Sequence, residues 1–345
     1  MHGRTMKRPD SAALGKQAEK LLRLPSGWVT SRKAVSGLSG WRRGSIPALL
    51  SILVAFLLVF HATVPNTIGR LGSLLETFLP WLGSAVPGLL ALALLRRSFV
   101  ALIALLLPVV AWISLFGYLL FPSHESAGEI TALQHNVSDE NPDPAGTARI
   151  LIKAQADLIA LEELTPSALP ALAAAMAPDY PHHATKGTVG LWSKYPLSDV
   201  RPVDIRPEGI GEDWNRGLRA TARTTQGDVG VYVAHLPSVR VGLSSGFSSA
   251  WRDESAVLLG EAIAAERLDK VILLGDLNST LDDRGLAPVS SQMNATGSGF
   301  AFSWPAALPV ARIDQIMTRS ATVTDFWSLP ATGSDHLPIA AHIRL

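Results

Sequence analysis

Three long apolar runs in the first third of the chain constrain its fold more than any other feature. They are Ile46–Val64, Phe78–Leu95 and Phe99–Phe121. Each is long enough, or nearly so, to cross a hydrocarbon core that needs about 20 helical residues. A cleaved signal peptide would predict one short apolar region of about 7–15 residues instead. With 48% hydrophobic and only 17% charged residues overall, the chain is predicted to carry three transmembrane helices.

The second run is the least regular of the three. Pro80 and Pro87 lie within it, and Glu76 comes just before it. Because proline removes a backbone donor and clashes with the preceding turn, a kinked or partly interfacial helix is the alternative here.

The basic residues predict how these helices are oriented. Residues 1–45 contain ten lysines and arginines against two acidic residues, and the connector before the third run contains Arg96 and Arg97. The stretch 122–129 has no lysine or arginine. An in-out-in-out path satisfies the positive-inside rule, with a cytoplasmic N-terminus and everything beyond Pro122 outside the cell membrane. A basic arm can also bind nucleic acid, but a solvated tail near anionic lipid is the commoner meaning.

Beyond this anchor the sequence changes to short strand-like runs and amphipathic helices. We expect a basic N-terminal segment at 1–45, the anchor at 46–121, a tether at 122–128 and an α+β domain at 129–345, in which hairpins and helical connections predict mixed sheets covered by helices. The expected strands are 129–137, 158–161, 188–194, 218–224, 228–236, 271–275, 312–317 and 339–345. The expected helices are 147–155, 167–177 and 251–268.

Polar side chains follow the ends of these strands. Groups that separate strands deliver to one edge of a sheet can converge on a single cleft. Asp276 and Asn278 are two positions apart and would face the same space if the segment is extended. A carboxylate such as Asp314 inside an apolar strand is costly unless it is paired. The polar residues at strand ends are Asn136, Glu163, His235, Asp276, Asn278, Asp314, Asp335 and His336.

Taken singly, these residues have ordinary structural explanations. His235 is as consistent with a half-buried, hydrogen-bonded histidine as with a catalytic one, and Asp276 with Asn278 could cap a turn. Their combination and order along the chain favour a catalytic site.

The ordered motifs resemble those of the endonuclease/exonuclease/phosphatase superfamily, whose fold is a DNase I-like four-layer α/β sandwich. They are "HNV", "ADLIALEEL", "VGLWSKYPL", "VYVAHLPS", "VILLGDLNST", "SWPAALPVARIDQIM" and "SDHLPIAAHIRL". Two departures are visible: Glu162 stands where the family usually has glutamine, and Gln315 where histidine or tyrosine is frequent.

The resemblance implies a metal-dependent phosphoester hydrolase. Glu163 would be the principal ligand of Mg²⁺ or Mn²⁺, with Asn136 and Asp335 near the metal. Oxygen donors and the absence of cysteine suit these hard cations rather than zinc.

The resemblance also implies the catalytic roles. Asp276 would orient or deprotonate the attacking water, and Asn278 would hold a phosphate oxygen. His336, oriented by Asp314, and His235 would donate hydrogen bonds to the phosphate in the transition state.

The substrate is predicted from the tether. Its seven residues reach at most about 25 Å, so the domain stays near the bilayer and a membrane-held substrate is favoured. The three runs before this domain, with "HLPSVRVGLSSGF" and "WRDESA", resemble VanJ-type glycopeptide (teicoplanin) resistance membrane proteins. That likeness implies hydrolysis of a lipid-linked cell-wall carrier such as undecaprenyl pyrophosphate.

Other functions stay open. A tethered nuclease would need a basic groove, yet residues 200–260 hold seven arginines against seven acidic residues. The resemblance implies that Arg216 can contact phosphate. Arg219, close by in the sequence, is the alternative for this position. A phospholipid phosphodiesterase is a further alternative, and a non-catalytic lipid-phosphate-binding protein would require a missing catalytic residue. The partners expected are the bilayer and a lipid phosphate, with nucleic acid less favoured and no protein partner predicted.

Overall fold

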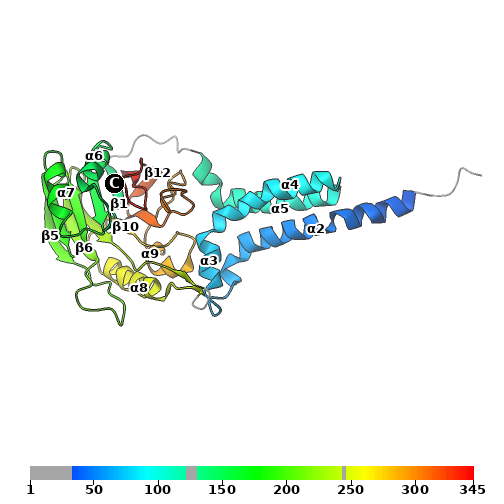
Figure 1. Cartoon of the computed structure of the whole chain (residues 1–345), viewed down its shortest axis with the longest axis horizontal. Coiled ribbons are helices and arrows are strands. Elements are labelled where there is room, and N and C mark those ends of the chain that lie inside the picture. Colours follow the sequence, from blue (N-terminus) through cyan, green and yellow to red (C-terminus); the bar gives the residue numbers. More distant parts are fainter. Residues whose placement is uncertain (1–32, 122–129, 243–245) are drawn as a thin grey trace, which may run out of the picture.

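The computed structural model describes residues 33–121, 130–242 and 246–345, with side chains from Gly44 onward. Within these ranges a stem of helices projects from an α/β body (Figure 1). The basic segment up to residue 32 and the predicted tether at 122–128 lie outside the described residues.

The stem contains two helices that are long and apolar enough to cross a membrane, Gly44–Thr63 and Phe99–Leu120. A third candidate is a bent pair, Leu71–Thr77 with Leu79–Leu95, whose axes meet at 69°. Pro80 lies in the first turn after this bend, where proline disfavours a continuous helix. The elements are α2 (Lys33–Phe60), η1 (His61–Thr63), α3 (Leu71–Thr77), η2 (Leu79–Ser84), α4 (Ala85–Leu95), α5 (Phe99–Phe116) and η3 (Gly117–Leu120).

The helices of the stem alternate in direction. Gly44 of α2 lies against Ser98, the N-cap of α5, because a Cβ placed on Gly44 would meet the Ser98 hydroxyl. Arg96 and Arg97 therefore lie level with the start of the first apolar span, at the end of the stem away from the body (Figure 1). Apolar side chains along α2, α4 and α5 are exposed, as lipid-facing helices require.

The body contains two large mixed sheets. The six-stranded sheet has the order β12-β13-β1-β2-β4-β3, and the five-stranded sheet the order β11-β10-β7-β6-β5. The strands of the first sheet are β1 (Ile130–Asn136), β2 (Leu158–Glu162), β3 (His182–Lys186), β4 (Val189–Ser193), β12 (Thr322–Ser328) and β13 (Ile339–Arg344). The strands of the second are β5 (Leu197–Pro202), β6 (Gly217–Thr224), β7 (Gly227–Ala234), β10 (Val271–Asp276) and β11 (Asp314–Arg319), and β8 (Val241–Gly242) pairs separately with β9 (Gly246–Phe247).

Alternating side chains build the four layers. On β2, Leu158 and Ala160 face the core between the sheets, whereas Ile159 and Leu161 face the outer core under two helices. Those helices are α6 (Pro144–Ile152) and α7 (Leu169–Met176). On the far side α8 (Ala250–Ala264), η4 (Arg284–Leu286) and α9 (Ala287–Ser290) cover the five-stranded sheet. The predicted α+β sandwich is confirmed.

The sequence did not predict β3, β5, β12 or the two-residue strands β8 and β9. β3, β5 and β12 each lie at an edge of a large sheet, as does β11, which was predicted from its apolar run. Edge strands bury less surface and carry more polar residues, so β3, β5 and β12 lack the apolar runs that identified the central strands.

Candidate active site

The two sheets bring polar residues to one edge. β1 and β2 are parallel, with Asn136 opposite Glu162, so Asn136 and Glu163 emerge together. β10 runs parallel to β7 and antiparallel to β11, where Asp276 pairs with Asp314. The strand ends therefore deliver carboxylates from both sheets to the same place.

A cleft of about 650 Å³ opens at this edge. Six of the residues singled out from the sequence line it: Asn136, Glu163, Asp276, Asn278, Asp335 and His336. Asp314 and His235 are buried just behind its wall. Thr77 and Phe78, from the bend in the stem, also line the cleft, and nothing in the sequence predicted this.

Asp314 and His336 form a buried pair. His336 Nδ1 lies 2.8 Å from Asp314 Oδ2, which also accepts a hydrogen bond from Ser303 Oγ. Asp314 Oδ1 accepts a bond of 2.9 Å from Gln134 Nε2. Burial disfavours the imidazolium, but Asp314 and Asp276 outweigh it and raise the pKa of His336 to about 10. Asp314, the carboxylate predicted to be costly unless paired, therefore has three partners.

Asp276 faces the other ring nitrogen of His336, with 3.8 Å between Asp276 Oδ2 and His336 Nε2. Its oxygens accept hydrogen bonds from Asn136 Nδ2 at 3.0 Å and from the backbone N–H of Asn278 at 2.9 Å. Burial raises the pKa of Asp276 to about 7. Asp276 therefore has the position of a base, beside a positively charged imidazolium.

Asn278 reaches the cleft by a route different from the predicted one. The strand ends at Asp276, and Asn278 has a left-handed backbone with φ of 47°. The argument from an extended segment was therefore wrong, although both side chains line the cleft. Asn278 Nδ2 donates to the Leu236 carbonyl at 2.9 Å, which fixes the side chain.

His235 is held differently from His336. Arg216 Nη1 lies 3.2 Å from His235 Nδ1 and 3.4 Å from its Nε2, and because a guanidinium can only donate, the ring nitrogen that it bonds is the acceptor. Its Nε2 lies 3.7 Å from Asp276 Oδ2 and 3.8 Å from Glu163 Oε1. Burial, and then the charge of Arg216, lower the pKa of His235 well below its usual value. A neutral His235 therefore faces the cleft carboxylates, and Arg216 lies beside it with its guanidinium over the Trp214 ring.

Two clusters could hold a cation. The ligand atoms of Asp276, Asp314 and His336 lie within 4.8 Å of one another. However, Asp314 and His336 are bonded to each other there, and both Asp314 oxygens accept further donors. A hydrogen-bonded dyad explains this cluster better than a metal cage.

Glu163 has the better chemistry for a metal. Its carboxylate is partly open to the cleft, and among the described residues it accepts from Asn136 Nδ2 at 3.0 Å and the Asp139 N–H at 3.2 Å. It follows β2 with φ of 57°, a conformation uncommon for a residue with a side chain. Glu163, Asn136 and the exposed Asp335 line one cleft, and carboxylate oxygens of this kind fit a hard divalent cation. Asn136 turns its Nδ2 toward Glu163, and its Oδ1 accepts from the Ser138 N–H.

The two departures from the family pattern do not reach the cleft. Glu162 is fully buried and its Oε2 accepts from Gln134 Nε2 at 2.7 Å. Gln315 is also buried, and its Nε2 donates to the carbonyls of Ser279 and Arg312. Both side chains support the residues behind the site, as do Gln134 and Ser303, which the sequence analysis missed.

The comparisons with known proteins agree with this geometry. The sequence profile of the Endonuclease/Exonuclease/phosphatase family matches residues 133–336. The chain belongs to this family. Its members are metal-dependent phosphoester hydrolases. No curated protein matches the sequence closely enough to count as a relative.

Solved structures of the family share its fold. An endonuclease/exonuclease/phosphatase from Bacteroides vulgatus has a TM-score of 0.51 and 18% identity, covering 63% of this chain and 98% of its own. D. rerio TDP2 in complex with a single-strand DNA product has a TM-score of 0.51 and 16% identity, covering 63% and 99%. Beta toxin from Staphylococcus aureus has a TM-score of 0.50 and 16% identity, covering 62% and 99%.

Proposed function

We propose that this protein is a membrane-anchored, divalent-metal-dependent phosphohydrolase that acts on a lipid-linked pyrophosphate, with undecaprenyl pyrophosphate as the substrate to be tested first. The observation that carries the proposal is the composition of the cleft. Thr77 and Phe78 of the stem line the same space as Glu163, Asp276 and His336. A substrate bound there contacts both the catalytic residues and the apolar anchor.

The charge of the cleft favours this substrate over nucleic acid. Among the described residues that line it there is no lysine or arginine, and four acidic residues accompany Asp276. DNA binding relies on several basic contacts to phosphates. The apolar lining, which includes Phe78, Val241, Phe247 and Trp304, suits a lipid phosphate.

The proposed reaction is a direct displacement at the terminal phosphorus. Asp276 accepts a proton from the water as its oxygen bonds to phosphorus, and the bond from that phosphorus to the bridging oxygen breaks. The products are orthophosphate and the lipid monophosphate, which leaves as an anion and needs no proton donor. His336, kept cationic and oriented by Asp314, donates to the phosphate oxygens, while Asn278 fixes the phosphate in place.

A metal bound by Glu163, with Asn136 and Asp335 near it, would supply positive charge for the phosphate oxygens. His235 stands between this carboxylate and Asp276. Its neutral ring is placed to donate to the phosphate without competing with the cation.

The stem supports the predicted orientation. Arg96 and Arg97 lie at its far end beside Gly44, the end that the basic N-terminal segment enters. The positive-inside rule assigns that end to the cytoplasm and the catalytic cleft to the outside. Hydrolysis there would return the carrier lipid to its monophosphate form, which links the activity to glycopeptide resistance.

The direct test is phosphate release by purified protein in detergent with Mg²⁺. The assay offers three substrates separately: undecaprenyl pyrophosphate, plasmid DNA and a phospholipid. EDTA and the variants Glu163→Gln and His336→Gln serve as negative controls. Glu261→Gln, at an exposed position, is the matched control variant. We expect phosphate release from the lipid pyrophosphate alone. EDTA and either cleft variant should abolish this release, and Glu261→Gln should leave it unchanged. Cleavage of DNA or phospholipid in its place would overturn the proposal.

A further inference from the structure

A second cavity lies beside the cleft, on the side of the stem. It has a volume of about 560 Å³, and its lining is almost entirely apolar. α5 contributes Val109, Trp112 and Ile113, and the bend contributes Pro80 and Trp81. We call this cavity the stem groove.

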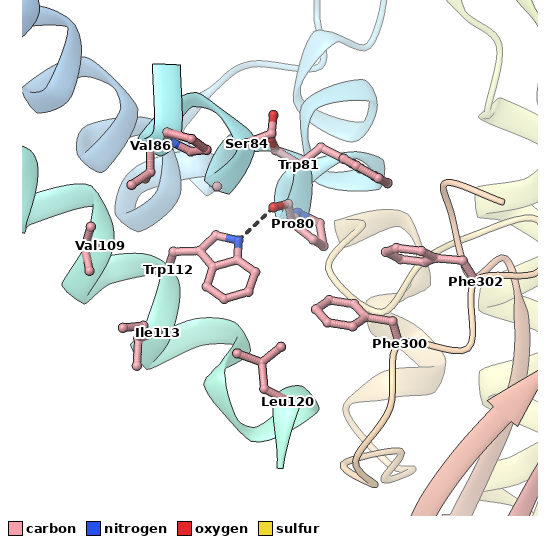
Figure 2. A pocket seen from close by; sticks show the side chains of 12 residues that line it. Pro80, Trp81, Ser84, Val86, Val109, Trp112, Ile113, Leu120, Phe300 and Phe302 are labelled. Carbon is pink, nitrogen blue, oxygen red and sulfur yellow. Dashed lines mark hydrogen bonds between the residues drawn. The ribbon is translucent and has the colours of Figure 1, made fainter. Parts of the chain in front are cut away.

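The body closes one side of the stem groove. Figure 2 shows Phe300 and Phe302 reaching from a loop of the body toward the side chains of the stem. Phe302 stacks on Trp81 with ring centroids 5.7 Å apart, and Phe300 on Trp112 with 6.4 Å. The groove is therefore formed between body and stem together.

Hydrogen bonds fix both tryptophans. Trp112 Nε1 donates to the Pro80 carbonyl at 2.7 Å (Figure 2). Trp81 Nε1 donates to the Val310 carbonyl of the body at 2.6 Å. The indole rings are held with their polar atoms satisfied and their apolar surfaces free to line the groove. Gly83 permits this, because a Cβ there would meet the Trp112 ring.

The stem groove adjoins the catalytic cleft. Between them lies a small space of about 50 Å³ that shares Thr77 and Ala311 with the cleft. The same space shares Pro80, Phe300 and Phe302 with the groove, and Asp282 and Arg312 also line it. A molecule whose phosphate lies at His336 would reach the groove along this bend.

We infer that the stem groove binds the first isoprenoid units of a polyprenyl pyrophosphate and thereby sets the position of its pyrophosphate in the cleft. The inference rests on the proposed function. One apolar groove with aromatic walls matches a single branched hydrocarbon chain, whereas a diacyl lipid brings two chains. Because lipid tails are as apolar as the groove, moving the chain out of the bilayer gains little hydrophobic free energy. The contribution of the groove is positioning, and small displacements at a reacting centre cost about 10²-fold in rate.

The test blocks the groove and compares two substrates with the same head group. Val109→Trp fills the groove, and Val110→Trp places the same bulk on the neighbouring exposed position of α5. We expect Val109→Trp to lower kcat/KM for undecaprenyl pyrophosphate about tenfold or more while changing that for five-carbon isopentenyl pyrophosphate less than about twofold. Val110→Trp should change neither. Equal effects of both variants, or equal effects on both substrates, would overturn the inference.

A second measurement separates this inference from the proposed function and needs no altered side chain in the groove. A polyprenyl pyrophosphate with a photoreactive benzophenone in its first isoprenoid units is crosslinked to the wild-type protein in EDTA, so that no turnover is required. Crosslinks mapped to the side chains of Trp112 or Phe300 themselves support the groove even if no phosphate is released in the activity assay. Labelling confined to the exposed face around Val110, or displacement of the probe by a diacyl phospholipid, would contradict it.

Discussion

Carboxylates are buried both at the catalytic edge and where the stem meets the body, and the two regions hold them differently. At the catalytic edge Asp314 and Asp276 face His336, whose charge depends on its surroundings. Where the stem meets the body, Glu76 of α3 pairs with the Arg284 side chain of η4 through two hydrogen bonds, at 2.8 and 2.7 Å, and its Oε1 also lies 2.9 Å from His61 Nδ1. An arginine keeps its charge and holds parts together, whereas a histidine between carboxylates can donate to a substrate. The arginine pair therefore positions the anchor, whereas the histidine pair serves the chemistry.

The largest effect should follow from breaking the catalytic pair. Asp314→Asn removes the charge that orients and stabilises the His336 imidazolium, and we expect kcat to fall about 10³-fold or more, as for other buried carboxylates that orient a catalytic histidine. Phosphate release from the lipid pyrophosphate measures this. The variant should retain the circular dichroism spectrum of the wild type; a variant that folds and hydrolyses at the normal rate would show that the pair is only structural.

The junction pair should behave in the opposite way. Arg284→Met leaves the buried Glu76 carboxylate without its guanidinium partner, with His61 Nδ1 and the backbone N–H of residue 284 still beside it, and so destabilises the junction. We expect a lower thermal midpoint in detergent, and turnover of undecaprenyl pyrophosphate that falls more than turnover of isopentenyl pyrophosphate, because the stem no longer holds its place beside the cleft.

The exposed Arg267 supplies the matched control for this experiment. Arg267→Met removes the same charge from the surface and should leave the thermal midpoint within about 1 °C. An equal loss in both variants would mean that the Glu76–Arg284 pair contributes no more than a surface charge.

A pH titration tests a second carboxylate–arginine pair, Glu266 with Arg219. Burial raises the pKa of Glu266, but bonds from Arg219 and the Leu268 N–H outweigh it and lower the pKa to about 2. Since the folded pKa is below the unfolded value of about 4.3, the pair stabilises the protein above that pH. This contribution is lost as pH falls from about 4.5 to 2. Thermal midpoints should drop less over this range in Glu266→Gln than in wild type, and parallel curves would refute the assignment.

The catalytic edge could be predicted from the sequence because its residues interrupt apolar strands at their ends. Asp276 and Asp314 stand in or after runs that must be buried, so their polarity was conspicuous. The junction could not be predicted in this way. Glu76 and Arg284 are 208 positions apart, and although Glu76 is conspicuous beside an apolar run, nothing in the sequence points to Arg284 as its partner. Only the packing of stem on body brings them together, and the same packing places Thr77 and Phe78 in the cleft.

The smallest effect is expected where the chain departs from its family. Glu162 does not line the cleft, and its described hydrogen bond uses an oxygen that accepts from Gln134 Nε2. Glu162→Gln keeps the shape of the side chain and that acceptor, so kcat/KM for the lipid pyrophosphate should stay within about twofold of wild type. Glu162→Ala would instead leave Gln134 with one partner fewer beside Asp314 and should lower kcat more. If Glu162→Gln were as damaging as Glu162→Ala, the carboxyl group itself would be needed, and the cleft would depend on an acid that the family position does not usually provide.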